Sequence, residues 1–142
     1  MNKYLAGFIA GFIATAVLSL LMMLKAQMGL MPQFNVVQDI NLFFGAEIVL
    51  VGWIVHFLLG TFIWGGLFVL LSSVLIGAYW IRGICFGIIA WLLMMVGYMP
   101  VMDHGVFAVA LGMPIMIATL VLHIIYGFVV GLIYGFLPKS RL

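Results

Sequence analysis

Charged residues are scarce in this chain. Asp, Glu, Lys and Arg together make up 6% of the 142 residues, whereas hydrophobic residues make up 68%, and the mean hydropathy is +1.44. So little polar surface cannot cover a water-soluble globule, which excludes a soluble fold and indicates that the solvent is lipid. The net charge is only +2, and no basic cluster is dense enough for nucleic acid, so we expect no nucleic-acid partner.

The chain also lacks the groupings that disulfide formation and nucleophilic catalysis need. Its single cysteine, Cys85, has no partner, so no intramolecular disulfide can form. Ser72 and Ser73 fall at the inner end of the expected membrane bundle, across the membrane from the candidate base His104, so a serine triad cannot be assembled. We therefore expect a protein that is not an enzyme and has no catalytic residues.

Long apolar stretches are what the sequence does contain. Four of them, at residues 4–24, 48–71, 81–99 and 114–137, suit a hydrocarbon layer about 30 Å thick, for which a helix needs roughly 20 residues. Spans of a β-barrel would alternate polar and apolar residues, whereas these stretches are apolar on every face. We predict an all-α membrane protein with four transmembrane helices in a single domain, 1–142. The basic start of the first stretch resembles a signal peptide, but its length favours a retained span.

One pattern occurs twice along the chain. The glycine-containing motif of residues 7–14 returns at residues 83–90. A glycine, a histidine and a second glycine also recur 67 positions later, as Gly45, His56 and Gly60 and then Gly112, His123 and Gly127. This recurrence predicts two tandem parallel two-helix repeats, at about 4–72 and about 81–137. Each repeat is expected to contain a span, a Met-Pro turn, a short outer interfacial helix and a second span.

The interfacial segments carry their own signals. Asn35 can cap a helix in the first repeat, and Asp39 and Asn41 fall on the polar side of that helix. In the second repeat Asp103 replaces Asn35 as the candidate cap of a shorter segment at residues 106–111. We therefore expect an amphipathic helix at the outer membrane surface in both repeats.

The few charges are divided between the two ends of the expected bundle. The basic residues on one side are Lys3, Arg82, Lys139 and Arg141. The acidic residues Asp39, Glu47 and Asp103 fall on the other side with a single basic residue, Lys25. Because basic residues favour the cytoplasmic side, both termini are predicted to be cytoplasmic.

Glycine is frequent, with 17 residues. In lipid, small residues let helix backbones approach closely. The candidate packing glycines recur along single helix faces, and they are Gly7, Gly11, Gly52, Gly60, Gly127, Gly131 and Gly135. His56 and His123 lie on two of these faces, so we expect both imidazoles to face protein. Such faces also predict assembly into a homo-oligomer or with other membrane subunits.

His56 and His123 are the main candidates for a site. Each lies eleven residues after the glycine that precedes its span, about 16 Å along the helix, so both are expected near the membrane centre. Ionisable groups at that depth are costly and are functional candidates. The pair could bind a b-type haem, coordinate a metal ion or pass a proton. Alternatively, each neutral imidazole could hydrogen-bond a carbonyl, a hydroxyl or the other imidazole and fix the helix register.

Haem binding and copper binding have arguments on both sides. Glycines near the histidines leave room for a porphyrin, but tight glycine faces draw helices together, and only Lys25 could pair with the propionates at the outer end. Apart from Met1, all the methionines fall in the outer half, and thioethers favour Cu(I). The densest set of candidate metal ligands is Met99, Met102, Asp103 and His104. Methionine also fills irregular gaps in apolar cores.

Several glycine and aromatic motifs together resemble a family of small four-span bacterial inner-membrane proteins of unknown function. The motifs are Gly7-x3-Gly11, Met31-Pro32, Gly52-Trp53-x2-His56-x3-Gly60, Trp64-Gly65, Gly87-x2-Ala90-Trp91 and His123-x2-Tyr126-Gly127. The resemblance covers nearly the whole chain. It implies a bacterial cytoplasmic membrane and supplies no activity, cofactor or catalytic residue.

These observations lead us to expect a non-enzymatic integral membrane protein that serves as a structural or accessory subunit or forms a homo-oligomer. Two alternatives stay open. In the first, His56 and His123 bind a b-type haem or a metal. In the second, the protein is a small proton or ion conductor, for which a bundle of four spans offers only a narrow path and an oligomer could be needed.

Overall fold

The computed structural model describes residues 1–139, and within them the chain is helical and has no strand. The four spans are α1 (Lys3–Gln27), Val49–Leu71, Tyr79–Val101 and α7 (Met113–Phe136). The second span consists of α3 (Val49–Leu58), the π-helix η1 (Leu59–Trp64) and α4 (Gly65–Leu71), and the third of α5 (Tyr79–Leu93), the π-helix η2 (Met94–Tyr98) and α6 (Met99–Val101). All four are long and apolar enough to cross a membrane, so the prediction of an all-α, four-span membrane protein is confirmed.

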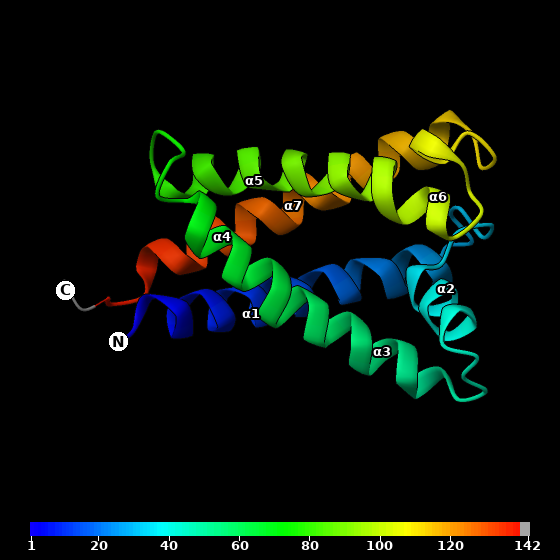
Figure 1. The fold of residues 1–142 in the computed structure, drawn as a ribbon, viewed down its shortest axis with the longest axis horizontal. Helices are drawn as coiled ribbons and strands as arrows, with labels where there is room; N and C mark the ends of the chain where they lie inside the picture. Colours follow the sequence, from blue (N-terminus) through cyan, green and yellow to red (C-terminus); the bar gives the residue numbers. More distant parts are fainter. Residues whose placement is uncertain (140–142) are drawn as a thin grey trace.

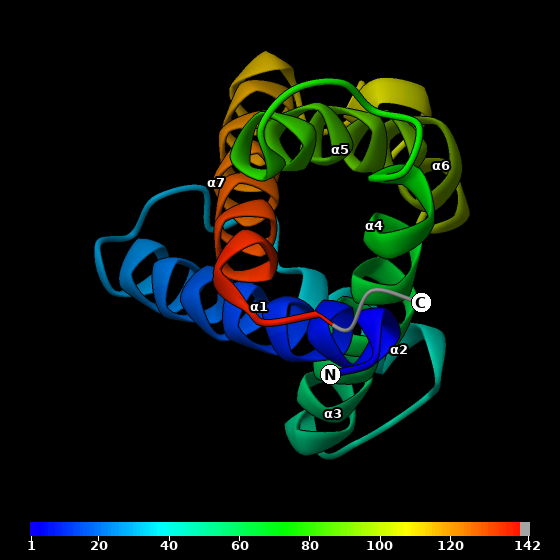
Figure 2. The same cartoon turned by 90° about the vertical axis from the view of Figure 1, so that its left-hand side faces the viewer.

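The spans form two hairpins (Figure 1). In the first hairpin α1 packs against η1 and α4, in the second α5 packs against α7, and the contact between α1 and α7 joins the two. Viewed from one end, α1, α4, α5 and α7 follow one another around the molecule (Figure 2). Each helix therefore has neighbours on two sides and keeps an apolar outer face, as expected of helices surrounded by lipid.

The ends of the molecule differ in charge. The N terminus, the connection between α4 and α5 and the last turn of α7 lie at one end, and α2 (Val36–Phe43) and α6 lie at the other (Figure 1). Lys3, Arg82 and Lys139 belong to segments at the first end. Arg141, which also entered the predicted orientation, lies outside the described residues. The cytoplasmic location of the termini stays a prediction. We call the end that holds the N terminus the inner end and the opposite end the outer end.

Glycines bring the first hairpin into backbone contact. A Cβ atom added to Gly11 would lie 2.8 Å from the Gly60 carbonyl oxygen and 3.0 Å from the Gly65 Cα, and one added to Gly65 would lie 2.7 Å from the Gly7 carbonyl oxygen. A Cβ on Gly60 would overlap the Thr15 hydroxyl. The predicted packing glycines of α1 therefore contact the second span of the same chain.

The second hairpin is closed in the same way. A Cβ on Gly83 or on Gly127 would overlap the backbone of the other residue, and Gly131 lies equally close to the Tyr79 carbonyl. A Cβ on Gly135 would lie 3.2 Å from the Tyr79 Cβ. Because these glycines pack within the chain, they are not a free face for assembly. The expected homo-oligomer or complex with other subunits would need a different surface, and it stays a prediction.

The interfacial helix of the first hairpin is present as α2. Asn35 caps it as predicted, with its side-chain oxygen accepting hydrogen bonds from the backbone N–H groups of Val37 and Gln38 at 3.0 and 3.3 Å. Asn41, which was predicted on the polar side, is instead 8% exposed. Its Oδ1 accepts from the Gly52 N–H at 2.6 Å. The interpretation of Asn41 was wrong because Gly52, with no side chain, lets α2 lie directly on α3 and turns this amide inward.

The corresponding segment of the second hairpin is not the predicted helix. Within residues 106–111 only Val106–Ala108 forms a short 3-10 helix, and Phe107 inside it has a φ of 57°. Asp103 is not a cap, because its φ is 61° and the residue that precedes the 3-10 helix is Gly105. Asp103, Phe107 and Ala108 have φ values of 61°, 57° and 53°, which a regular right-handed helix cannot contain.

Two buried clusters stabilise the molecule. The cluster nearer the termini contains Ala6, Ala10, Ala14, Phe68, Val69, Phe86, Tyr126, Val130 and Tyr134. The cluster at the outer end contains Phe34, Met95, Met99, Ala108 and Ile115. Met99, one of the candidate copper ligands, is thus a fully buried core residue, which is an ordinary use of methionine.

Candidate functional site

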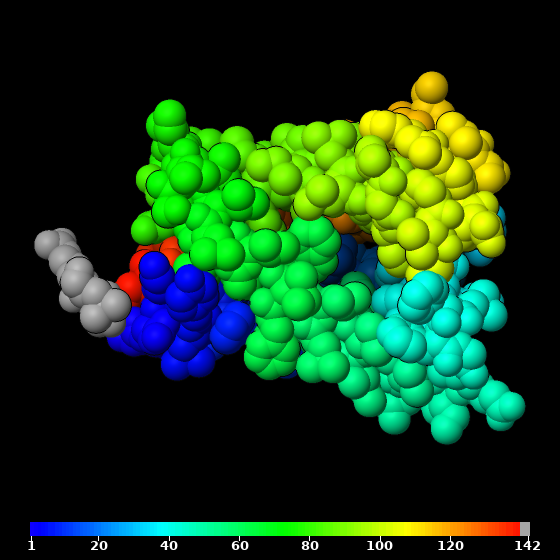
Figure 3. Space-filling view, in the orientation of Figure 1, coloured from blue at the N-terminus to red at the C-terminus, as the bar shows by residue number. Residues whose placement is uncertain are grey.

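A cavity of about 640 Å³ lies between the two hairpins. Side chains from all four spans line it, together with the loop that precedes α2. Its volume falls within the range of roughly 300–1,000 Å³ that is usual for small-molecule sites. In Figure 3 the surface is hollowed between α5 and the second span, and α1 and α7 are visible behind the gap. Because both bordering helices belong to candidate membrane spans, we expect this opening to face lipid.

The lining is mostly apolar, with a small set of polar side chains. The apolar residues include Leu18, Met22, Leu59, Ile63, Leu93, Met94 and Leu122. The polar residues are Thr15, Lys25, Asn35, His56, Tyr98, Thr119, His123 and Tyr126, with the indole groups of Trp53 and Trp64 beside them. Such a lining can hold an apolar molecule and fix its orientation through a few hydrogen bonds.

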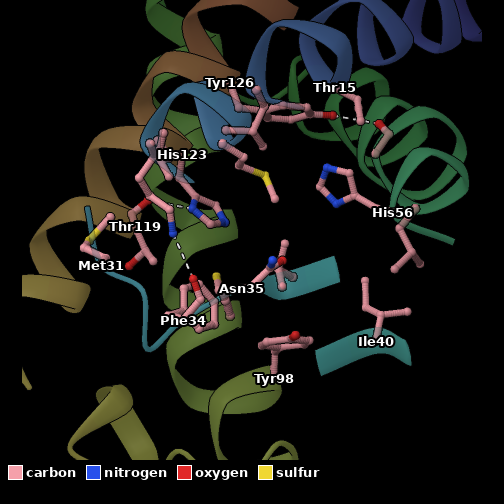
Figure 4. A pocket seen from close by; sticks show the side chains of 18 of the residues that line it. Thr15, Met31, Phe34, Asn35, Ile40, His56, Tyr98, Thr119, His123 and Tyr126 are labelled. Carbon is pink, nitrogen blue, oxygen red and sulfur yellow. Dashed lines mark hydrogen bonds between the residues drawn. The ribbon is translucent and has the colours of Figure 1, made fainter. Parts of the chain in front are cut away.

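The two histidines singled out from the sequence line this same cavity (Figure 4). His56 comes from α3 and His123 from α7, so one imidazole is supplied by each hairpin. Both side chains are half-buried. The structure thus places the matched positions around one interior space, which is the arrangement that any joint role of the two residues requires.

The hydrogen bond of His123 determines its tautomer. Its Nδ1 lies 2.8 Å from the carbonyl oxygen of Thr119. A carbonyl only accepts hydrogen bonds, so Nδ1 donates and Nε2 keeps its lone pair. No residue of the described chain donates to that Nε2. His123 therefore offers a hydrogen-bond acceptor, or a metal ligand, beside the cavity.

The hydrogen-bonding groups of His56 are less well satisfied than those of His123. Its Nε2 is buried and has no hydrogen-bond partner among the described residues. Its ring meets the rings of Trp53 and Phe57 edge to face, at centroid distances of 6.0 and 6.1 Å. These aromatic contacts hold the imidazole but do not satisfy its nitrogen. A buried polar atom without a partner costs about 1–3 kcal/mol, so a ligand that supplied one would gain affinity.

Tyr126 and Thr15 are buried residues of the cavity lining. The Tyr126 hydroxyl donates to the Gly60 carbonyl at 2.7 Å and so connects α7 to η1. Thr15 donates to the Gly11 carbonyl at 2.7 Å within α1. Neither residue was predicted to be part of a site, although Tyr126 stands in the motif His123-x2-Tyr126-Gly127, three residues after His123.

Both π-helices of the described chain contribute to the lining. Leu59, Gly60 and Trp64 come from η1, and Met94 and Tyr98 come from η2. A π-turn widens a helix locally, and such turns occur frequently at functional sites. The widened turns therefore coincide with the place where the two hairpins separate around the cavity.

A polar cluster joins the hairpins at the outer end. Asp39 in α2 lies 2.8 Å from His104 Nε2 and accepts a hydrogen bond of 3.3 Å from the Tyr98 hydroxyl. The side chains of His104 and Asp39 are only 19% and 14% exposed. Tyr98 is the one member of this cluster that lines the cavity, and Asp39 and His104 lie behind it. This cluster was not predicted from the sequence, because 65 positions separate Asp39 from His104.

The candidate copper ligands are not alike in their surroundings. Met99 is fully buried, Met102 is half-buried and Asp103 is exposed. His104 Nε2 is engaged by Asp39, so His104 could bind copper only through Nδ1. Among the described residues no three His, Cys, Asp or Glu side chains form a group that could hold a metal ion. Copper binding by methionine and His104 stays a prediction.

Among residues 1–139, Lys25 is the one Lys or Arg side chain in the cavity wall. Its ammonium nitrogen donates to the Phe34 carbonyl at 2.8 Å and lies 5.9 Å from the centroid of the Phe34 ring. The sequence predicted Lys25 to be a single basic residue on the side of the bundle that holds the acidic residues. The structure adds that it borders an apolar interior.

Comparison with curated proteins gives no match, and comparison with solved structures gives none either. A family model matches residues 1–141, which is nearly the whole chain. The prediction of a family of unknown function is therefore confirmed, whereas the bacterial inner membrane stays a prediction. The chain belongs to the family of unknown function DUF6789.

Proposed function

We propose that this chain is a non-enzymatic integral membrane protein that binds a lipid-soluble small molecule in the cavity between its hairpins. The observation that carries the proposal is the pair of imidazoles at this cavity, one from each hairpin, each with a ring nitrogen that the described chain leaves without a hydrogen bond. A molecule with a few polar atoms and a large apolar part would satisfy both the histidines and the lining.

The shape of the cavity supports entry from the bilayer. The hollow between α5 and the second span opens on the side of the molecule (Figure 3). Leu59 and Leu93, from the two bordering spans, both line the cavity and are 40% and 56% exposed. An apolar molecule can therefore pass between these side chains without crossing a polar surface. In this role the protein acts as a binding or accessory protein of the membrane.

The hydroxyl groups near the histidines support binding over catalysis. Thr15 donates to Gly11 and Thr119 donates to Ile115, at 2.7 and 2.8 Å. Each hydroxyl is thus used by the backbone of its own helix, and neither donates to an imidazole as an activated nucleophile would. These groups stabilise the cavity wall.

The proposal is tested by filling the cavity with larger side chains. Leu18 and Leu122 line it from different hairpins, whereas Leu20 and Val121 lie on the same helices and are 61% and 50% exposed. The probe is oleoyl lysophosphatidylcholine, and the bound fraction is measured by native mass spectrometry of detergent-purified protein. Overfilling a packed site costs about 1–3 kcal/mol, which corresponds to a loss of affinity of roughly 5- to 150-fold.

The expected result is loss of lipid binding in the Leu18→Phe/Leu122→Phe variant and unchanged binding in the Leu20→Phe/Val121→Phe control. Equal binding by both variants and by the unsubstituted protein would show that the lipid sits on the outer surface. That outcome would refute a binding function for the cavity.

A b-type haem is a second candidate, and one observation favours it. His123 donates Nδ1–H to a backbone carbonyl, an arrangement that commonly fixes the tautomer of a metal-bound imidazole and directs Nε2 at the metal. His56 would provide the second axial ligand, and Lys25, which also lines the cavity, could pair with a propionate.

The visible spectrum tests this candidate directly. Protein produced with abundant haem should show a Soret band and a reduced alpha band, and His56→Ala or His123→Ala should remove both. His104→Ala is the matched control, because His104 contacts Asp39 and is not part of the cavity lining. A colourless preparation would eliminate haem and would leave the lipid-binding proposal intact.

A further inference from the structure

The position of Lys25 indicates which class of ligand the cavity binds, an inference that rests on the proposed function. The side chain lies in the last turn of α1 at the outer end of the molecule and lines the cavity. One hydrogen bond, to the Phe34 carbonyl, is its only hydrogen bond within the described chain. An ammonium group has three N–H donors, so two remain for a ligand. The carbonyl and the Phe34 ring hold this cation at the wall of an apolar space.

No carboxylate of the described chain neutralises Lys25. The one ion pair found there joins Asp39 to His104, and the same carboxylate oxygen also accepts from Tyr98. The other acids of this end, Glu47 and Asp103, are exposed. A cation beside an apolar cavity is costly unless an anion accompanies it. A ligand with a negative charge can supply the counterion that the described chain does not provide for Lys25.

Two other basic side chains behave differently. Arg82 donates to the carbonyls of Gly77 and Ser72, both at 2.7 Å, and thereby fixes the connection between α4 and α5. Lys139 donates to the carbonyls of Tyr134 and Leu137 at the same end. Neither lines the cavity. Among these cations Lys25 is therefore the one placed to recognise a ligand.

We infer that the cavity binds an anionic amphiphile, an acidic lipid whose phosphate or carboxylate pairs with Lys25 at the outer end and whose apolar chain occupies the space between the hairpins. The lateral opening admits the chain from the surrounding leaflet (Figure 3). His56 and His123 line the same cavity (Figure 4).

The test compares two probes with the same chain and different charge. Oleoyl lysophosphatidylglycerol carries a net negative charge, and oleoyl lysophosphatidylcholine is neutral overall. Native mass spectrometry of the detergent-purified full chain measures the affinity for each. The unsubstituted protein should prefer the acidic lipid by roughly tenfold, the effect of one charged hydrogen bond. Lys25→Gln should remove that preference, and the matched control Lys3→Gln should keep it.

Further arms identify the source of the charge and guard against misfolding. Oleic acid should bind as a carboxylate in place of a phosphate, and inorganic phosphate alone should not displace either lipid. Lys25→Arg keeps the cation and should restore the preference, so a folding defect of Lys25→Gln would not hide the result. An equal affinity for both lysolipids in the unsubstituted protein would overturn the inference, as would displacement by inorganic phosphate.

Failure of this inference can be distinguished from failure of the proposed function. If Leu18→Phe/Leu122→Phe loses binding of both lysolipids but Lys25→Gln leaves both affinities unchanged, the cavity binds lipid without selecting for its charge. If the filled variant still binds both lipids, the cavity is not their site and both proposals fall.

Discussion

The close contact between α1 and α4 makes a sharp prediction about two neighbouring glycines. A Cβ atom on Gly65 would lie 2.7 Å from the Gly7 carbonyl oxygen and 3.2 Å from its carbonyl carbon, whereas ordinary contact begins at 3.4 Å. The facing backbone would have to move by about 0.7 Å, and a backbone cannot turn aside as a side chain can. On Gly66 the same atom would meet only the Phe8 ring, at 3.4 Å.

Gly65→Ala should therefore lower the free energy of unfolding by about 1–3 kcal/mol, the usual cost of overpacking. Gly66→Ala should leave it unchanged or raise it by up to about 1 kcal/mol, because alanine loses less backbone entropy than glycine in a helix. The two substitutions add the same methyl group at adjacent positions of one helix. Any general effect of alanine on this span is thus cancelled in their difference.

The measurement is reversible unfolding in mixed micelles with increasing dodecyl sulfate, followed by circular dichroism and by tryptophan fluorescence. Expected is a lower midpoint for Gly65→Ala and an equal or higher midpoint for Gly66→Ala. If the two variants unfold at the same denaturant fraction, α1 and α4 are not in backbone contact. The account of how glycine closes the first hairpin would then be wrong.

Three further predictions concern hydrogen bonds, and the same unfolding titration measures them. Asn41→Leu leaves the Gly52 N–H without its acceptor and should cost about 1–3 kcal/mol; a neutral effect would place α2 away from α3. Tyr126→Phe removes the bond to the Gly60 carbonyl and should cost about 0.5–1.5 kcal/mol, and a larger loss would indicate a second role for the hydroxyl. Asp39→Asn and His104→Ala should show a coupling energy of about 0.5–3 kcal/mol in a double-mutant cycle; additive effects would separate the two side chains.

The spans and the first interfacial cap could be predicted from sequence because both depend on local composition. An apolar stretch of about 20 residues can only be a helix in lipid, whatever its neighbours are. Asn35 caps α2 by accepting hydrogen bonds from N–H groups two and three residues away, so its role can be predicted from the local sequence. For features of this kind no tertiary contact has to be known.

Other features depended on contacts that no local pattern records. Asn41 is buried because α3 presents a glycine to it, eleven positions further along the chain. Asp39 and His104 meet only when the hairpins are assembled, so neither composition nor spacing indicates the pair. Asp103 was predicted as a helix cap from its residue type, but its φ of 61° places it in a left-handed turn and not at the start of a helix. The cavity itself is a property of all four spans together.

The position of the cavity follows from where the close glycine contacts end. In the inner half Gly11 and Gly60 bring α1 and η1 into backbone contact, and Gly87 lies against the backbone of His123 in the second hairpin. Beyond these points larger side chains face inward, among them Leu18 of α1 and Trp53 of α3. Bulky residues keep neighbouring helices further apart than glycines do. The bundle therefore closes at its inner end and opens around His56 and His123, so a lipid-soluble ligand would reach both imidazoles without separating the glycine contacts that hold the fold.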